Sequence, residues 1–179
     1  MNSQTQATTT DGKKVILDKN GTWMYAEADC GALIKSGTYA GGKTMLLSKE
    51  DIIVSPDNGA TGVKISLTRG TNLLLVNIIN LVPKLKCVAE KAPITLEFVD
   101  GTKMVTQHAA NSNCTADFSL TLGKTKDDIK LLDILKSKKI RKITIGYTTS
   151  ESKEYTEEFI FTNVQAEKFS KTIQCLFNS

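Results

Sequence analysis

The spacing of apolar residues changes part-way along this chain, and that change constrains the fold more than any other feature. Residues 63–68 and 117–122 alternate apolar with polar side chains, which is typical of strands that bury one face. Residues 73–81 form a mostly apolar run, which indicates a central strand. Apolar residues then recur at helical spacing in residues 126–137 and 165–177. Strands followed by helices predict an α+β fold.

The expected architecture is a mainly antiparallel β-sheet of about five to eight strands joined by hairpins. Two amphipathic helices in the C-terminal half are expected to cover one face of it. Thr125 and Asp128 have the spacing of a capping box at the start of the first helix. The residues expected to meet in the core are Leu132, Leu135, Phe169 and Ile173 from the helices and Phe98, Phe118, Ile145 and Phe161 from the sheet.

The sequence indicates three segments. Residues 1–10 are polar and uncharged apart from the terminus, so we expect a flexible tail. Residues 11–44 are interpreted as an N-terminal β-hairpin extension and a Gly-rich loop, with strands at 14–17 and 22–25. Residues 45–179 are expected to form the main α+β domain.

Asp100 and Gly101 are expected to form the two-residue turn of a hairpin between residues 93 and 108. Opposed residue numbers in such a hairpin add up to a constant, here 201, and 87 and 114 also add up to 201. Cys87 and Cys114 would then lie opposite each other at the open end of the ribbon. A disulfide there would close a loop of about 28 residues and stabilise the fold by roughly 3 to 4 kcal/mol.

Two buried free thiols are the alternative for Cys87 and Cys114. Cys30 and Cys175 rank second as disulfide candidates. The four cysteines show no CxxC spacing, which disfavours a zinc knuckle or a thioredoxin-type redox pair. Their even number favours an oxidising compartment.

The charge balance disfavours nucleic-acid binding. The chain has 23 basic and 19 acidic residues, and only Arg69 and Arg141 supply the guanidinium that phosphate and base recognition favours. One dense basic cluster follows the first helix, where cations interact well with the helix dipole. We interpret this cluster as a solvated face, with a patch for an anionic partner as the alternative; it comprises Lys136, Lys138, Lys139, Arg141 and Lys142.

Residues 37–44 match the phosphate-binding pattern G-x-x-x-x-G-K-[ST] through Gly37, Gly42, Lys43 and Thr44. Such a loop needs a buried strand before it and a long helix after it, because the helix N-terminus supplies amide donors to the phosphates. The β-branched segment 52–54 and the hairpins that follow do not fit that context. We therefore expect a glycine-rich loop, with nucleotide binding as the alternative.

His108 is the chain's one histidine, which excludes zinc and iron sites that need two imidazoles. It could form a thiolate pair with Cys30 or Cys114, but we interpret it as a surface residue at a strand end. No set of residues forms an acid-base dyad. We expect no catalytic residue, no metal and no cofactor, and hence no enzyme.

Two compartments remain open. No stretch of the sequence approaches the 18 consecutive apolar residues of a membrane-spanning helix. The polar run that begins at Ser3 resembles the start of a mature chain after signal-peptide removal, whereas a chain that began naturally at Met1 would be cytoplasmic.

The sequence resembles a group of uncharacterised exported proteins of Bacteroidetes-type bacteria. The segments that carry the resemblance are Asp11–Leu17, Asn20–Trp23, Cys87, Ile94–Thr102, Cys114, Lys139–Ile145 and Gln174–Leu176. The resemblance implies export to a compartment that permits disulfides, and it brings no catalytic residue.

The hypothesis from the sequence is a non-enzymatic exported binding or accessory module, in the periplasm or at the cell surface. Its expected partner is a protein, a glycan or a small molecule, and not a nucleic acid. The alternative is an intracellular nucleotide-binding protein that uses the Gly37 to Thr44 segment. The oligomeric state is left open.

Overall fold

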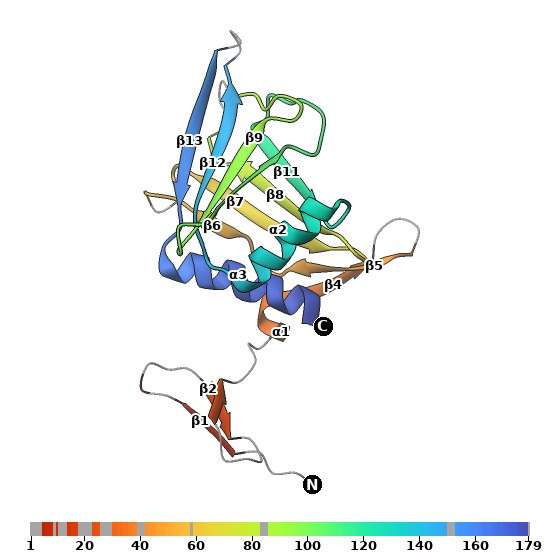
Figure 1. The fold of residues 1–179 in the computed structure, drawn as a ribbon, viewed down its shortest axis with the longest axis vertical. Helices are drawn as coiled ribbons and strands as arrows, with labels where there is room; N and C mark the ends of the chain where they lie inside the picture. Colours follow the sequence, from red (N-terminus) through yellow and green to blue (C-terminus); the bar gives the residue numbers. More distant parts are fainter. Residues whose placement is uncertain are drawn as a thin grey trace. The chain divides into compact units, whose positions relative to one another are not determined.

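The chain forms two compact units, Met1–Cys30 and Gly31–Ser179, in the computed structural model (Figure 1). The structure describes residues 5–8, 10, 14–17, 23–25, 30–38, 42–57, 59–82, 86–149 and 153–178. In the first unit, strands β1 (Thr5–Thr8), β2 (Lys14–Leu17) and β3 (Trp23–Tyr25) form an antiparallel sheet in that order. Strand β1 lies within the segment expected to be a tail, and it pairs with β2.

The second unit contains two antiparallel sheets. The strands of the larger sheet lie in the order β11-β8-β7-β5-β4, with β6 also paired to β7, and the smaller sheet has the order β10-β9-β12-β13. The chain from Cys30 onward forms α1 (Cys30–Leu33), β4 (Ile34–Thr38), β5 (Thr44–Ser48), β6 (Ile52–Val54), β7 (Val63–Arg69), β8 (Leu74–Asn80), β9 (Pro93–Phe98), β10 (Lys103–Gln107), β11 (Asp117–Leu122), α2 (Lys126–Ser137), β12 (Ile140–Thr148), β13 (Glu154–Ile160) and α3 (Asn163–Asn178).

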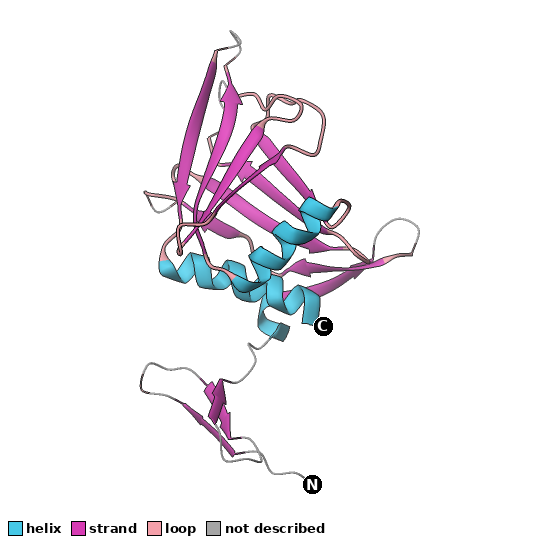
Figure 2. Cartoon of the chain, viewed as in Figure 1, coloured by secondary structure: helices cyan, strands magenta, loops and turns pink. Residues whose placement is uncertain are grey.

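The α+β architecture confirms the fold expected from the sequence. Burial alternates along β7, β8 and β11, so each of these strands turns one face to the core. Helices α2 and α3 contact each other, α2 packs on β11, and α3 contacts strands of both sheets. Figure 2 shows the two helices lying across the same end of the strands.

The boundary of the larger unit lies earlier in the chain than the sequence indicated. Residues 34–38 and Thr44, assigned above to the extension, form β4 and the first residue of β5 in the six-stranded sheet. Strand β5 pairs with β4 along its whole length and with β7 through Leu46 and Leu47. The short apolar segments of β4 and β5 are thus stabilised by pairing, which their own sequence does not reveal.

Each long helix begins at a reciprocal cap. The Asp128 amide donates to Thr125 Oγ1 at 3.1 Å, and the Thr125 amide donates to Asp128 Oδ2 at 2.9 Å, which confirms the predicted capping box. Helix α3 begins at Asn163 instead of 165. The cause is a second cap. The Thr162 amide donates a hydrogen bond to Gln165 Oε1 at 2.8 Å, and the Gln165 amide donates one to Thr162 Oγ1 at 3.3 Å.

The hairpin between β9 and β10 differs from the expected two-residue turn. Leu96 pairs with Met104, so opposed numbers add up to 200 and three residues, 99 to 101, form the loop. Gly101 adopts a φ of +83°, as the last residue of a three-residue hairpin loop requires. The extra loop residue shifts the register of the whole ribbon by one.

The core residues named from the sequence are confirmed. All eight belong to one buried cluster that includes both sheets and both helices. Phe169 of α3 packs edge-on against Phe161, with ring centroids 5.9 Å apart.

Truncating Leu132 to Ala should lower the free energy of unfolding by about 2 to 5 kcal/mol, because Leu132 is 5% exposed and its removal leaves a cavity. The matched control is Ile129→Ala on the same helix, where the side chain is 49% exposed and the loss should stay below about 1 kcal/mol. Urea unfolding of both variants tests this. Equal losses would contradict the packing of α2 described here.

Candidate functional site

The basic cluster after α2 is neutralised within the molecule. Each of its five cations lies within ion-pair distance of a carboxylate. The pairs are Lys136–Asp133, Lys138–Asp100, Lys139–Glu167, Arg141–Glu97 and Lys142–Glu158, at 3.3, 2.7, 3.1, 3.3 and 2.7 Å. These pairs lower the positive potential that an anionic partner would need, and they favour the interpretation as a solvated face.

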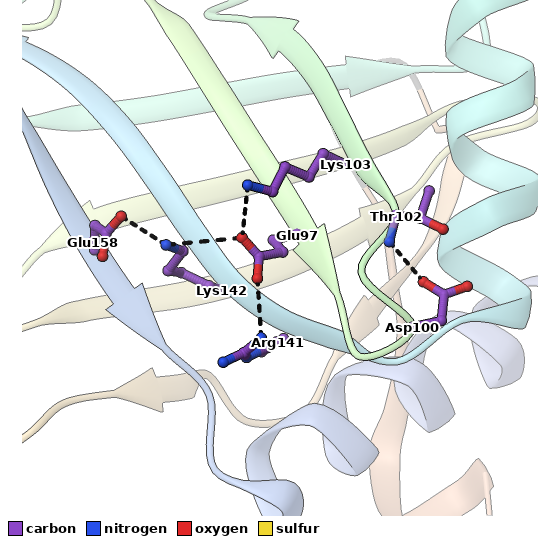
Figure 3. A network of polar contacts seen from close by, with 7 residues as sticks. All are labelled: Glu97, Asp100, Thr102, Lys103, Arg141, Lys142 and Glu158. Carbon is purple, nitrogen blue, oxygen red and sulfur yellow. Dashed lines mark hydrogen bonds and ion pairs between the residues drawn. The ribbon is translucent and has the colours of Figure 1, made fainter.

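A β-bulge organises the centre of this cluster. Ile140 pairs with Phe98 and Lys142 pairs with Glu97, so Arg141 is an extra residue in β12. Neighbours in a regular strand point to opposite faces, whereas here Arg141 and Lys142 both approach the Glu97 carboxylate, at 3.3 and 3.8 Å. Lys103 approaches it from β10 at 3.4 Å, as Figure 3 shows. Glu97 is therefore the common partner of cations from two strands.

Asp100 should contribute acid-sensitive stability through the same region. The hydrogen bond from Lys138 lowers the pKa of Asp100 from 3.8 to about 2, and the Thr102 amide adds a second bond at 3.0 Å. A depressed pKa in the folded state means that the stabilisation is present above pH 4 and is lost as the pH falls towards 2.

The test is urea unfolding of the wild type, Asp100→Asn and Lys138→Gln between pH 2 and 5. Both variants should show a smaller loss of stability over this interval than the wild type. Identical pH profiles for the three proteins would contradict the assignment.

The segment that matches a phosphate-binding loop begins in one strand and ends in its antiparallel neighbour, and residues 39–41 between them lie outside the described residues. Gly37 belongs to β4, Thr38 pairs with Thr44, and Thr44 opens β5. Lys43 is exposed just before β5. A strand therefore follows the motif where a phosphate-binding loop requires the N-terminus of a helix.

His108 is buried, at 3% exposure, so its interpretation as a surface residue was wrong. Its Nδ1 accepts a hydrogen bond from the Ser119 amide at 3.0 Å, and its Nε2 lies 3.1 Å from the Asn111 carbonyl oxygen. The first bond requires a lone pair on Nδ1, which assigns the proton to Nε2. The ring also packs on Phe118, with centroids 4.9 Å apart. Nδ1 thus joins the segment after β10 to β11, and Nε2 holds Asn111 within that same segment.

The Cys87–Cys114 disulfide is present, as the sequence predicted. Its geometric basis differs from the expected one, because the hairpin register adds up to 200. A separate antiparallel bridge between Val88 and Asn113 restores the sum of 201 at the neighbouring cysteines. Cys30 and Cys175 are disulfide-bonded as well, so neither Cys30 nor Cys114 offers a thiolate to His108.

The disulfide secures one wall of a cavity of about 360 Å³. Beside the disulfide, the backbones of Cys87 and Thr148 exchange two hydrogen bonds of 2.8 Å, which hold the segment after Cys87 against β12. That segment then folds into a turn closed by the Ala92 amide on the Ala89 carbonyl. The cavity is lined by Ala89, Ala92, Pro93, Gly146, Tyr147, Thr148, Glu154, Tyr155 and Thr156.

Gly146, Thr148, Glu154 and Thr156 share one face of the β12–β13 hairpin at this cavity, and Tyr147 and Tyr155 turn their rings to the other, core-facing side. The rings of Tyr147 and Tyr155 stack with centroids 5.8 Å apart and an interplanar angle of 29°. Burial raises the pKa of Tyr147, whose hydroxyl lies 3.4 Å from Asn80 Nδ2, and partial burial also raises the pKa of Tyr155. A Cβ at Gly146 would lie 3.1 Å from the Pro93 ring, so a side chain there would push the two walls apart.

The walls of the cavity fit a small-molecule site better than the larger hollow beside β10. That hollow, of about 540 Å³, is lined mostly by polar groups, and Asp128 in its wall is already engaged in capping α2. Small-molecule sites typically enclose 300 to 1,000 Å³ with aromatic walls and a few polar groups. The cavity beside Tyr147 and Tyr155, here called the tyrosine cavity, has a volume in that range and a mainly apolar lining with a few polar groups.

Sequence reasoning missed every residue of the tyrosine cavity. One signal was present, because an isolated glycine inside a strand indicates a bulge or a close approach, and Gly146 lies inside β12. The partners that make this glycine part of a cavity come from β9 and β13 and from the turn before β9, and no spacing along the sequence connects them.

Comparisons with known proteins return no match: no protein-family model, no curated protein and no solved structure is significantly similar to this chain. Within the part of the chain that the structure describes, no helix has the length and apolar character needed to cross a membrane. No group of three or more His, Cys, Asp or Glu residues gathers as a metal site among the described residues.

Replacing both Cys87 and Cys114 with Ser should lower the free energy of unfolding by roughly 3 to 4 kcal/mol, because the bond links residues 27 apart in sequence. Guanidinium unfolding of the variant and of the wild type measures the loss. A loss below about 1 kcal/mol would show that the backbone bonds between Cys87 and Thr148 hold this wall without the disulfide.

Proposed function

We propose that this protein is a non-enzymatic exported binding module that takes a small ligand in the tyrosine cavity. The observation that carries the proposal is the cavity itself, with the β12–β13 hairpin on one side and a secured turn on the other. A site whose walls are held before the ligand arrives loses little conformational entropy on binding.

The cysteines support the exported part of the proposal. The Cys87–Cys114 bond is present, and Cys30 and Cys175 are also oxidised. Disulfides form and persist mainly in secreted, periplasmic and cell-surface proteins. The resemblance to exported Bacteroidetes-type proteins points the same way. Two residue types that might have supplied chemistry are already engaged, since His108 bonds through both ring nitrogens and the cysteines are paired.

The rival function, intracellular nucleotide binding through residues 37 to 44, draws no support from the local structure. Thr44 begins a strand, and the exposed Lys43 precedes it without a helix N-terminus to supply further donors. Oxidised cysteines also fit an intracellular location poorly.

Filling the cavity should abolish ligand binding. Ala89→Tyr places a large ring on the exposed turn that forms one wall, and Ala110→Tyr adds the same ring at an exposed position outside the cavity. A fragment library screened by ligand-observed NMR should contain compounds that bind the wild type and Ala110→Tyr but not Ala89→Tyr. If no compound distinguishes the two variants, the cavity is not the binding site.

The compartment has its own test. Protein purified from its native host without reductant should show no free thiol after denaturation, and a peptide map should link Cys87 to Cys114. Four free thiols would overturn the exported part of the proposal and leave the cavity to be judged by the NMR screen.

A further inference from the structure

We infer that the hollow of about 540 Å³ beside β10 is a seam that takes up an extended, uncharged peptide segment of another protein as an added β-strand. Strand β10 is the last strand at one edge of the smaller sheet, and β11 is the last strand at one edge of the larger sheet. Residues of both strands line the hollow. The inference concerns a second site and does not depend on the tyrosine cavity.

The hollow follows the edge of β10. Val105, Thr106 and Gln107 are consecutive in this strand, and all three line the hollow, as do His108 and Ala109 directly after it. Neighbouring side chains in a strand point to opposite faces of the sheet. A hollow that touches every residue of such a run therefore lies along the edge of the strand, where its backbone groups are accessible.

Backbone groups that bond to β9 alternate along β10 with groups that point away from it. The Thr102 carbonyl accepts a bond from the last residue of β9, and the His108 amide donates one to the Ala92 carbonyl, both at 2.9 Å. Bonded pairs alternate along an antiparallel ladder, so the even-numbered residues of β10 bond to β9. The amide and carbonyl groups of Val105 and Gln107 therefore point outward, along the edge that borders the hollow.

The facing edge, on β11, is covered by side chains over part of its length. The Asn113 side chain bonds to both the amide and the carbonyl of Asp117, at 3.1 and 2.8 Å. The Ser119 amide donates to His108 Nδ1 at 3.0 Å. Thr121 is the next residue whose backbone points the same way, and it lines the hollow. The covered part of the edge thus ends where the hollow begins.

The two edges are joined at one end of the hollow. The Ala109 amide donates to the Ser119 carbonyl at 2.8 Å, and a continued ladder would place Gln107 opposite Thr121. Strands β10 and β11 share no backbone pair, however, so the ladder stops there. An added strand would bond to Val105 and Gln107 on one side and to Thr121 on the other. Unpaired strand edges are the usual template for such an addition.

The walls of the hollow favour a peptide without net charge. The charged residues that line it are two lysines and two aspartates, Lys91, Lys124, Asp127 and Asp128. Val105 is 70% exposed, so an apolar side chain of the peptide beside it would remove apolar surface from water. Thr106 lies on the other face of β10 and suits a small hydroxyl side chain. The expected occupant therefore alternates apolar residues with threonine or serine.

The probe is an acetylated pentapeptide amide of alternating threonine and valine, titrated into the isotope-labelled whole chain. At saturating peptide, hydrogen exchange measured by NMR should slow by at least about tenfold at the amides of Val105, Gln107 and Thr121, because each gains a bonded partner. The amides of β13, at the other edge of the smaller sheet, are the internal control and should keep their exchange rates.

A substitution tests the edge directly. Val105→Pro removes one outward amide and leaves the ladder to β9, because proline is tolerated at edge positions whose amide faces away from the sheet. It should weaken peptide binding by about tenfold or more. Val105→Thr keeps the amide and is the matched control, with an expected change below about threefold. A thermal unfolding curve verifies that each variant is folded.

Modified peptides give a test that needs no variant. Two peptides each carry one N-methyl group, on one of two neighbouring central amides. Neighbouring amides of a strand point to opposite sides, so both peptides should bind the wild type at least about tenfold more weakly than the unmodified one. A loss with only one of them would show addition to a single edge and contradict the seam.

Two further outcomes would overturn the inference. One is no binding of the unmodified peptide, or slowed exchange at β13 in place of β10 and β11. The other is slow exchange at Val105 and Gln107 in the free protein together with a dimer in sedimentation, which would give the seam to a second copy of the chain. Ala89→Tyr fills the tyrosine cavity and should bind the peptide as the wild type does, so the two sites are judged separately.

Discussion

The burial of one face of helix α3 against both sheets holds the larger unit together. Strands β4 to β7 of one sheet and β12 of the other all contact this helix. Phe169, Ile173 and Leu176 on that face are at most 3% exposed, and burial of each apolar side chain stabilises the fold by about 1.5 to 3 kcal/mol. Because one helix packs on both sheets, neither sheet can separate from the other without exposing the helix to water.

The position of the tyrosine cavity follows from this arrangement. Tyr147 and Tyr155 face the core side of the smaller sheet, at the end of the β12–β13 hairpin where the two strands are joined. Helix α3 contacts β12 as well, but it begins directly after the far end of β13. The tyrosine rings therefore fill the core at one end of the hairpin while α3 covers the other, and the cavity lies behind the rings, on the opposite face of the hairpin.

Sequence patterns predicted the elements well because the patterns are local. The period of apolar residues identified β7, β8, β11 and both long helices, and a capping box set the start of α2. The errors arose at the length of a turn and at a contact between different strands, which apolar periodicity does not report. One more residue in the β9–β10 loop moved the register by one, and the burial of His108 depends on the Ser119 amide of another strand. The cysteine pair was still identified correctly, because the register change in the loop is offset at the Val88–Asn113 bridge.

The candidate site could not be predicted from the sequence for the same reason. Its walls come from three places in the chain, which meet only after the smaller sheet forms and the segment after Cys87 is held against β12. The turn between Cys87 and β9 contains Lys91 with a φ of +58°. This conformation costs a residue other than glycine about 1 kcal/mol or more. Such a conformation persists only where its surroundings enforce it. The disulfide, the paired backbones of Cys87 and Thr148 and the Ala89–Ala92 bond all act on that short segment. The cost of the strained turn is thus met by bonds that also fix the cavity wall, so a ligand meets a surface that is formed in advance.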